Sequence, residues 1–220
     1  MAIHPYGVLV VVGLIVGYLF VRFRSKRYHL TVSDIDSVLV WIVIGGFLGA
    51  RLYHVLDYWP YYSLHPEKII AIWEGGIGIF GGIIGGSIAL FFWARHHQRS
   101  FLGLLTLMAP AFFFGQAIGR IGNFINQEGF GPPADFPWGV WFYESFWLLI
   151  GGSFLLFLEK RGILKGKYLG LALCWYGTGR FFLEFLRVDT AVVEGIKVGQ
   201  ILSLLFIIVG TFLIRENVKK

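Results

Sequence analysis

Seven long apolar runs constrain this chain more than any other feature of its sequence. They cover approximately residues 7–23, 37–56, 77–94, 101–120, 139–158, 168–187 and 199–214. A helix needs about 20 apolar residues to cross the hydrocarbon core of a bilayer. The chain is also 56% hydrophobic and only 15% charged, and soluble domains carry a larger charged fraction. The sequence therefore predicts an all-α, polytopic membrane protein with seven transmembrane helices.

The segments between the runs contain no soluble domain and no Ser/Pro-rich linker. We therefore expect a single integral membrane domain over residues 1–220. The first run has no Lys or Arg before it and no clear small-residue cleavage site, so we expect it to be retained. Cys174 is the single cysteine, which excludes an internal disulfide and argues against a cysteine metal site.

The distribution of Lys and Arg predicts the orientation of the chain. Thirteen of the 19 follow the first, third, fifth and seventh runs. They are Arg22, Arg24, Lys26, Arg27, Arg95, Arg99, Lys160, Arg161, Lys165, Lys167, Arg215, Lys219 and Lys220. Because cytoplasmic loops are rich in Lys and Arg, the N-terminus is expected outside and the C-terminus in the cytoplasm. These anchoring charges also account for the net charge of +6, so we expect no nucleic-acid partner.

Six cations break this bias and fall on the predicted outer side. They are Arg51, Lys68, Arg120, Arg180, Arg187 and Lys197. The four arginines among them lie at the ends of runs rather than in open loops. One interpretation is that they snorkel to the membrane interface. The other is a basic site in the outer leaflet, because a guanidinium binds phosphate through two parallel hydrogen bonds and an anionic phospholipid headgroup would suit it.

Residues 119–131 gather polar side chains at the end of the fourth run. Arg120, Asn123, Asn126 and Glu128 all fall in this stretch, among four glycines. Polar groups at membrane depth are costly and mark a functional site by default, and glycine lets the backbone approach a ligand closely. A polar helix cap followed by a rigid loop is the simpler alternative.

Other outer ends of runs add further candidates. Arg180 and Glu184 are spaced i and i+4, which permits an ion pair that is either structural or orients Arg180 toward a phosphate. Tyr6 begins the first run, and Tyr143 and Glu144 begin the fifth. His54 is a candidate for proton transfer or an ordinary interfacial residue.

A glycine ridge lies at the start of the third run. Gly78, Gly82 and Gly86 repeat at intervals of four residues. A ridge of small residues lets membrane helices pack closely, so we expect it to be a packing surface.

These stretches resemble the bacterial prolipoprotein diacylglyceryl transferase family over most of the chain. The resemblance is carried by Tyr6-Gly7, Gly49-Ala50-Arg51-Leu52, the glycine ridge after Trp73-Glu74, Gly119 to Gly131, Tyr143-Glu144, Tyr176 to Arg187, and Gly199-Gln200-Ile201-Leu202-Ser203. It implies a seven-helix, N-out enzyme of the bacterial cytoplasmic membrane. That enzyme moves diacylglycerol from phosphatidylglycerol to the lipobox cysteine of a prolipoprotein and releases glycerol phosphate.

The resemblance also implies roles for individual residues. We expect catalytic roles for Arg120, Arg180, Glu128 and Glu184. We expect substrate-binding roles for Tyr6, Arg51, Asn123, Asn126, Gly131, Tyr143 and Glu144. No metal or organic cofactor is required. Phe80 stands where the family often has a histidine, so the general base stays open, with Glu128 and His54 as candidates.

Two other functions remain as alternatives. Arginines and glycine-broken helices also suit an anion transporter or channel. Such a protein is expected to show an inverted repeat and polar residues at the midplane, whereas the charges here lie at one interface. A non-catalytic lipid-binding membrane protein is the third possibility.

Overall fold

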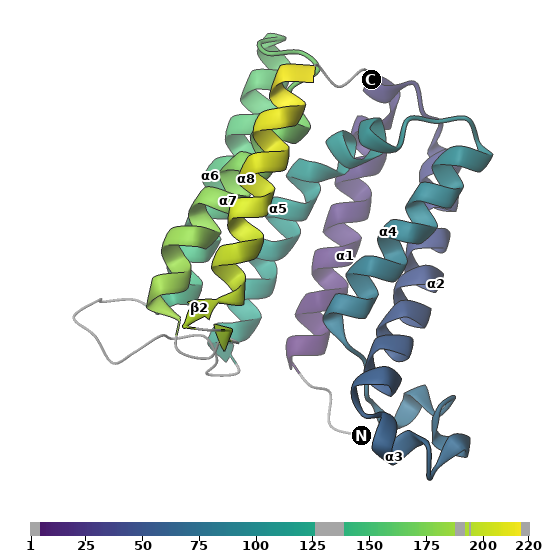
Figure 1. The fold of residues 1–220 in the computed structure, drawn as a ribbon. Coiled ribbons are helices and arrows are strands. Elements are labelled where there is room, and N and C mark those ends of the chain that lie inside the picture. Colours follow the sequence, from purple (N-terminus) through teal and green to yellow (C-terminus); the bar gives the residue numbers. More distant parts are fainter. Residues whose placement is uncertain (1–4, 126–138, 188–191, 194, 217–220) are drawn as a thin grey trace. The chain divides into compact units, whose positions relative to one another are not determined.

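The structure, a computed structural model, describes residues 5–125, 139–187, 192–193 and 195–216. Seven long helices in these residues coincide with the seven apolar runs (Figure 1). They are α1 (Pro5–Arg24), α2 (Val32–Asp57), α4 (Ile79–His96), α5 (Phe101–Ile125), α6 (Val140–Arg161), α7 (Tyr168–Leu183) and α8 (Val198–Glu216). By length and composition, α2, α5, α6 and α8 can each cross a membrane. The expected helical membrane architecture is confirmed, and the count of seven spans stays a prediction.

Short elements connect these helices. They are η1 (Ser25–Tyr28), α3 (Trp59–Tyr62), η2 (Pro66–Lys68), η3 (Ile72–Glu74), η4 (Glu184–Leu186), β1 (Val192–Val193) and β2 (Ile196–Lys197). The two strands form a small antiparallel hairpin that leads directly into α8. The chain packs as two compact units, one of residues 1–24 with 105–220 and the other of residues 25–104.

Glycines bring α2 and α4 together in the unit of residues 25–104. A Cβ on Gly49 would overlap the carbonyl oxygen of Gly81, and a Cβ on Gly85 would overlap that of Gly45. The predicted glycine packing is therefore present, but its register differs from the expected ridge. The tightest contacts on α4 are those of Gly81 and Gly85. Of the predicted ridge, a Cβ on Gly78 would overlap the Tyr53 ring, whereas a Cβ on Gly82 or Gly86 would meet its neighbours only at ordinary van der Waals distances.

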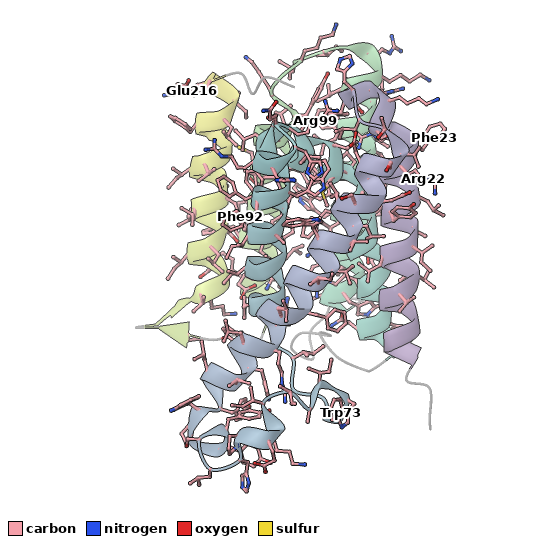
Figure 2. All side chains as sticks on the ribbon, turned by 90° about the vertical axis from the view of Figure 1, so that its right-hand side faces the viewer. Arg22, Phe23, Trp73, Phe92, Arg99 and Glu216 are labelled. Atoms are coloured by element: carbon pink, nitrogen blue, oxygen red, sulfur yellow. The ribbon has the colours of Figure 1, made fainter. Side chains whose placement is uncertain are left out.

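Arg51 organises the segment between α2 and α4. Its side chain is 8% exposed, and its guanidinium lies over the ring of Tyr62. It donates hydrogen bonds to the carbonyl oxygens of Lys68, Ile69, Ala71, Gly75 and Gly76. The same segment carries Trp73, which is 77% exposed and lies beyond the end of α2 (Figure 2). Arg51 thus fixes a loop that presents an aromatic side chain.

The other unit is built around α5, α6 and α7. Phe113, Ala117, Leu148, Leu155 and Ala172 form its buried core. Trp147 of α6 and Trp175 of α7 form a reciprocal pair that joins these two helices. Each indole N–H donates to the other residue's carbonyl oxygen over 3.0 Å, and the rings stack with centroids 4.5 Å apart.

A buried ion pair ties three helices of this unit together. Arg24, the last residue of α1, contacts the Glu159 carboxylate of α6 over 2.6 Å, and these side chains are 5% and 4% exposed. Arg24 also donates to the Leu107 carbonyl oxygen of α5 over 2.6 Å. The sequence placed Arg24 among the cations of the cytoplasmic side and did not indicate that its side chain would be buried in a partnered contact.

Candidate active site

The Glu144 carboxylate binds arginines from three separate segments. Arg120 of α5 contacts Glu144 Oε2 through Nε over 2.8 Å. Arg180 of α7 contacts Glu144 Oε1 through Nη1 over 2.8 Å. Arg187, which directly follows η4, reaches the same oxygen over 3.3 Å. The two arginines expected to act together therefore meet on one carboxylate.

Helix packing places Glu144 where these arginines can reach it. Its neighbour Ser145 donates to the Ala117 carbonyl oxygen over 2.9 Å, which ties the start of α6 to the end of α5. The start of α6 thereby lies beside Arg120, three residues after Ala117. Glu144 itself is 6% exposed. A buried carboxylate requires paired cations, and the arginines meet that requirement.

Glu184 completes the cluster from the end of α7. Arg180 Nη2 contacts Glu184 Oε2 over 3.1 Å, the i and i+4 pair that the spacing predicted. Glu184 is completely buried, and a Cβ on Gly199 at the start of α8 would overlap its carboxylate. The close approach of a glycine therefore makes room for the acid that orients Arg180.

Lys197 holds the backbone that carries Glu184 and Arg187. Its ammonium donates to the Glu184 carbonyl oxygen over 2.8 Å and to the Arg187 carbonyl oxygen. Carbonyl groups at a helix end lack partners within the helix and are satisfied by side chains such as lysine. Lys197 thus stabilises the turn that aims Arg187 at Glu144.

A small, half-open pocket lies beside this cluster. Its polar lining includes Arg120, Glu144 and Arg180, and its apolar lining includes Trp147 and Leu183. The three arginines are 19–23% exposed at their side chains. Three guanidiniums face two carboxylates, so the cluster keeps a formal net charge of +1. This excess positive charge beside an apolar wall is a combination that suits the phosphate of a lipid.

The remaining predicted residues are distributed as follows. Asn123 lies on α5 one turn after Arg120 and is partly buried. Tyr143 precedes Glu144 on α6 and is also partly buried. Tyr6 lies in the first turn of α1. Asn126, Glu128 and Gly131 fall outside the residues that the structure describes.

Arg51 and His54 have the following contacts within the unit of residues 25–104. Arg51 binds backbone carbonyls, as described above. The His54 ring packs against Tyr58 and Tyr62, with centroids 4.7 and 5.9 Å away. These contacts give Arg51 a structural role, and its predicted role in binding substrate stays a prediction.

Sequence reasoning missed two features of the site. Glu144 was expected to bind substrate, and its contacts as the shared counterion of three arginines were not foreseen. Gln116 and Tyr176 also line the pocket, and neither was singled out as a site residue. Gln116 had a detectable signal, since it is a polar residue inside an apolar run, one helical turn before Arg120.

Comparison with known proteins shows which family the chain belongs to. The family model for prolipoprotein diacylglyceryl transferase matches residues 1–215. The chain belongs to this family. The family resemblance inferred from the sequence is thereby confirmed, and it favours a membrane-bound transferase over a transporter or a lipid-binding scaffold.

Several curated relatives carry the name phosphatidylglycerol–prolipoprotein diacylglyceryl transferase. The one from Streptococcus uberis is 34% identical over 229 residues, covering 95% of this chain and 88% of the relative. The one from Clostridium novyi is 34% identical and covers 99% and 93%. The one from Trichormus variabilis is 35% identical and covers 94% and 83%. The similarity therefore extends over nearly the whole length of both partners.

Proposed function

We propose that this chain transfers the diacylglyceryl group of phosphatidylglycerol to the lipobox cysteine of prolipoproteins and releases glycerol phosphate. The substrates are those in the names of its relatives. The observation that carries the proposal is the convergence of Arg120, Arg180 and Arg187 on Glu144 beside an apolar pocket. The membrane lipid and the signal peptide of the prolipoprotein are then the two partners of the site.

The arginines have donors left for a lipid phosphate. A guanidinium carries five N–H donors in a planar fork. Arg120 meets Glu144 through Nε, so its two terminal amino groups can bind phosphate oxygens without breaking that contact. Glu144 and Glu184 hold Arg180 from two sides. The phosphate therefore enters a site whose charges are already oriented, which is usually the largest contribution to catalysis.

The reaction is a substitution at the glycerol carbon that carries the phosphate. The cysteine sulfur forms a bond to this carbon while the carbon–oxygen bond breaks. The electron pair passes to the phosphate oxygen, and glycerol phosphate departs with the added negative charge next to Arg120 and Arg180. The thiol proton passes to a base, for which we propose Glu128, with His54 as the weaker candidate. Thiolate is the reactive form of cysteine.

The other predicted residues bind the headgroup in this proposal. Asn123 and Tyr6 contact headgroup hydroxyls or phosphate oxygens. Asn126, Gly131, Tyr143 and Arg51 complete the substrate-binding set. Holding both substrates in line contributes much of the remaining rate acceleration.

The proposal also includes a membrane topology. The seven long helices span the bacterial cytoplasmic membrane as a single domain, with the N-terminus outside. The site then faces the outer leaflet, because Arg120 ends one predicted span and Glu144 begins the next. The thirteen cytoplasmic cations support this orientation.

The test is an assay with the purified protein, phosphatidylglycerol vesicles and a synthetic lipobox peptide. We expect a diacylglyceryl mass increase on the peptide cysteine and release of glycerol phosphate. A matched peptide with serine in place of cysteine serves as the control and gains no mass. Phosphatidylglycerol binding without any modified peptide would contradict a transferase and leave a lipid-binding protein, and anion flux through vesicles would indicate a transporter.

A further inference from the structure

The pocket contains a second polar layer below the arginine cluster. Gln116 precedes Arg120 by four residues on α5, and Tyr176 precedes Arg180 by four residues on α7. Residues i and i+4 lie on one helix face, and four residues span about 6 Å along the axis. Both steps run from a helix end toward its middle. Gln116 and Tyr176 therefore form a layer about one turn deeper in the protein than the guanidiniums.

One atom in this layer lacks a partner. Gln116 Nε2 donates to the Tyr176 hydroxyl over 3.4 Å, and this contact orients the amide. Gln116 Oε1 is buried and has no hydrogen-bond partner among the residues that the structure describes. Buried polar atoms in native proteins are nearly always satisfied, so each exception needs an explanation. An unpartnered acceptor that lines a pocket calls for a ligand with a hydrogen-bond donor.

The two substrates offer few donors at this depth. The diacylglyceryl group presents ester oxygens, which are acceptors. The hydroxyls of the glycerol headgroup lie on the far side of the phosphate from the acyl chains, hence toward the outer end of the site. The lipobox peptide brings two kinds of donor, its backbone N–H groups and the cysteine thiol, and of these only the thiol must reach the reacting carbon.

We propose that Gln116 Oε1 accepts a hydrogen bond from the thiol of the bound lipobox cysteine before the thiol proton passes to the base, so that the Gln116–Tyr176 layer is the thiol-binding part of the pocket. The inference rests on the proposed function. It assigns Gln116 to direct contact with the peptide substrate and Tyr176 to positioning the Gln116 amide.

The geometry of the reaction supports this assignment. The sulfur must approach the carbon from the side opposite the leaving phosphate oxygen. Reacting atoms in a near-attack arrangement lie about 3–3.5 Å apart, and one carbon–oxygen bond adds to that distance. The sulfur is then displaced from the leaving oxygen by nearly one helical turn. That displacement matches the step from the Arg120 layer to the Gln116 layer.

The experiment measures peptide binding without turnover. Lipobox peptides with serine or alanine in place of the cysteine are titrated into the full-length protein in lipid nanodiscs. Serine keeps a donor at the thiol position, and alanine removes it. We expect the wild-type protein to bind the serine peptide about fivefold more tightly than the alanine peptide, the effect of one net hydrogen bond.

Two substitutions at Gln116 test the residue. Gln116→Met keeps the length of the side chain and removes the acceptor, so the two peptides should bind equally. Gln116→Glu keeps an acceptor, so the preference for serine should persist. Thr211→Val is the control, because the Thr211 hydroxyl donates to Ile207 within α8 and is not among the residues lining the pocket.

The outcomes separate this inference from the proposed function. Equal binding of both peptides by the wild-type protein, or an unchanged serine preference in Gln116→Met, overturns the thiol-binding role. Loss of discrimination between phosphatidylglycerol and a hydroxyl-free headgroup analogue in Gln116→Met would assign Gln116 to the headgroup instead. The proposed function itself fails in a different assay, when the wild-type protein leaves the cysteine peptide unmodified.

Discussion

Helix α6 carries one buried glutamate near each end, and the two have different surroundings. Glu159 pairs with Arg24 in a contact whose side chains are 5% and 4% exposed. Glu144 binds Arg120, Arg180 and Arg187, whose side chains are 19–23% exposed. A pocket opens beside Glu144, whereas Glu159 does not line it.

The difference shows that contacts between arginine and glutamate can serve two purposes in one helix, joining helices and forming a candidate binding site. The Arg24–Glu159 contact is closed to solvent and joins helices. The Glu144 cluster has an excess of cations and stays partly open, so it can accept an added anion. An excess of cations beside an opening, rather than burial alone, is what distinguishes the candidate site.

The largest effect is expected at the closed pair. Arg24→Ala leaves the Glu159 carboxylate buried without this cation, and breaking a buried pair in this way costs about 3–5 kcal/mol. We expect the free energy of unfolding, measured by SDS titration in mild detergent, to fall by that amount. The kcat of the remaining folded enzyme should change little.

The double variant Arg24→Met with Glu159→Leu is the control for this effect. Replacing both charges by apolar groups removes the buried charge, and such replacements are often neutral. Most of the stability should therefore return. A double variant as unstable as Arg24→Ala would mean that the loss comes from another contact of Arg24, such as that with the Leu107 carbonyl oxygen, and not from the unpaired Glu159 charge.

The next effect is expected in the open cluster. Arg180→Ala removes a phosphate donor, and losing one such donor typically lowers the rate by about 10²–10³-fold. We expect this loss in kcat/KM for diacylglyceryl transfer, with membrane insertion unchanged. Arg180→Lys keeps the charge but not the planar fork, so its activity should be intermediate.

Arg161→Ala is a matched control, because Arg161 is an exposed arginine at the opposite end of α6. It should retain full transfer activity. Full activity in Arg180→Ala as well would remove the basis for placing the lipid phosphate at this cluster.

Local sequence patterns predicted part of this architecture. Runs of about 20 apolar residues predict helices because hydrocarbon leaves few other ways to satisfy the backbone. The Arg180–Glu184 pair followed from its i and i+4 spacing. Placing Arg120 and Arg180 at the same end of the predicted spans led to the expectation that they act together, and Glu144 is their meeting point.

Contacts between distant segments were not predictable in the same way. Arg24 and Glu159 are 135 residues apart, and no local pattern links them. Arg51 and Arg120 both lie near ends of apolar runs that are predicted to face outward, yet one binds backbone carbonyls and the other a carboxylate. The partner distinguishes these arginines, and the partner depends on which helices pack together.

Replacing each glutamate by glutamine, which removes its negative charge, sharpens the comparison. Glu144→Gln raises the formal charge of the cluster from +1 to +2, so the KM for anionic phosphatidylglycerol should not rise. The arginines lose the anion that fixes their positions, so kcat should fall by about tenfold, equivalent to about 1.4 kcal/mol. Glu159→Gln should lower the free energy of unfolding and leave both kinetic constants unchanged. A kcat loss in Glu159→Gln equal to that in Glu144→Gln would erase the distinction between the two ends of α6.

The smallest effect is expected where the backbone of α8 approaches the cluster. A Cβ on Gly199 would overlap the Glu184 carboxylate, so Gly199→Ala should displace that acid and disturb Arg180 indirectly. Overpacking of this kind costs about 1–3 kcal/mol, and we expect a loss of about threefold to tenfold in kcat with an unchanged KM for the peptide. Gly17→Ala is the control, because a Cβ there meets nothing within 4 Å. Equal activity of both variants would show that the Glu184 carboxylate can shift without disturbing Arg180. In that case the contact with Glu144 alone would hold Arg180 in position.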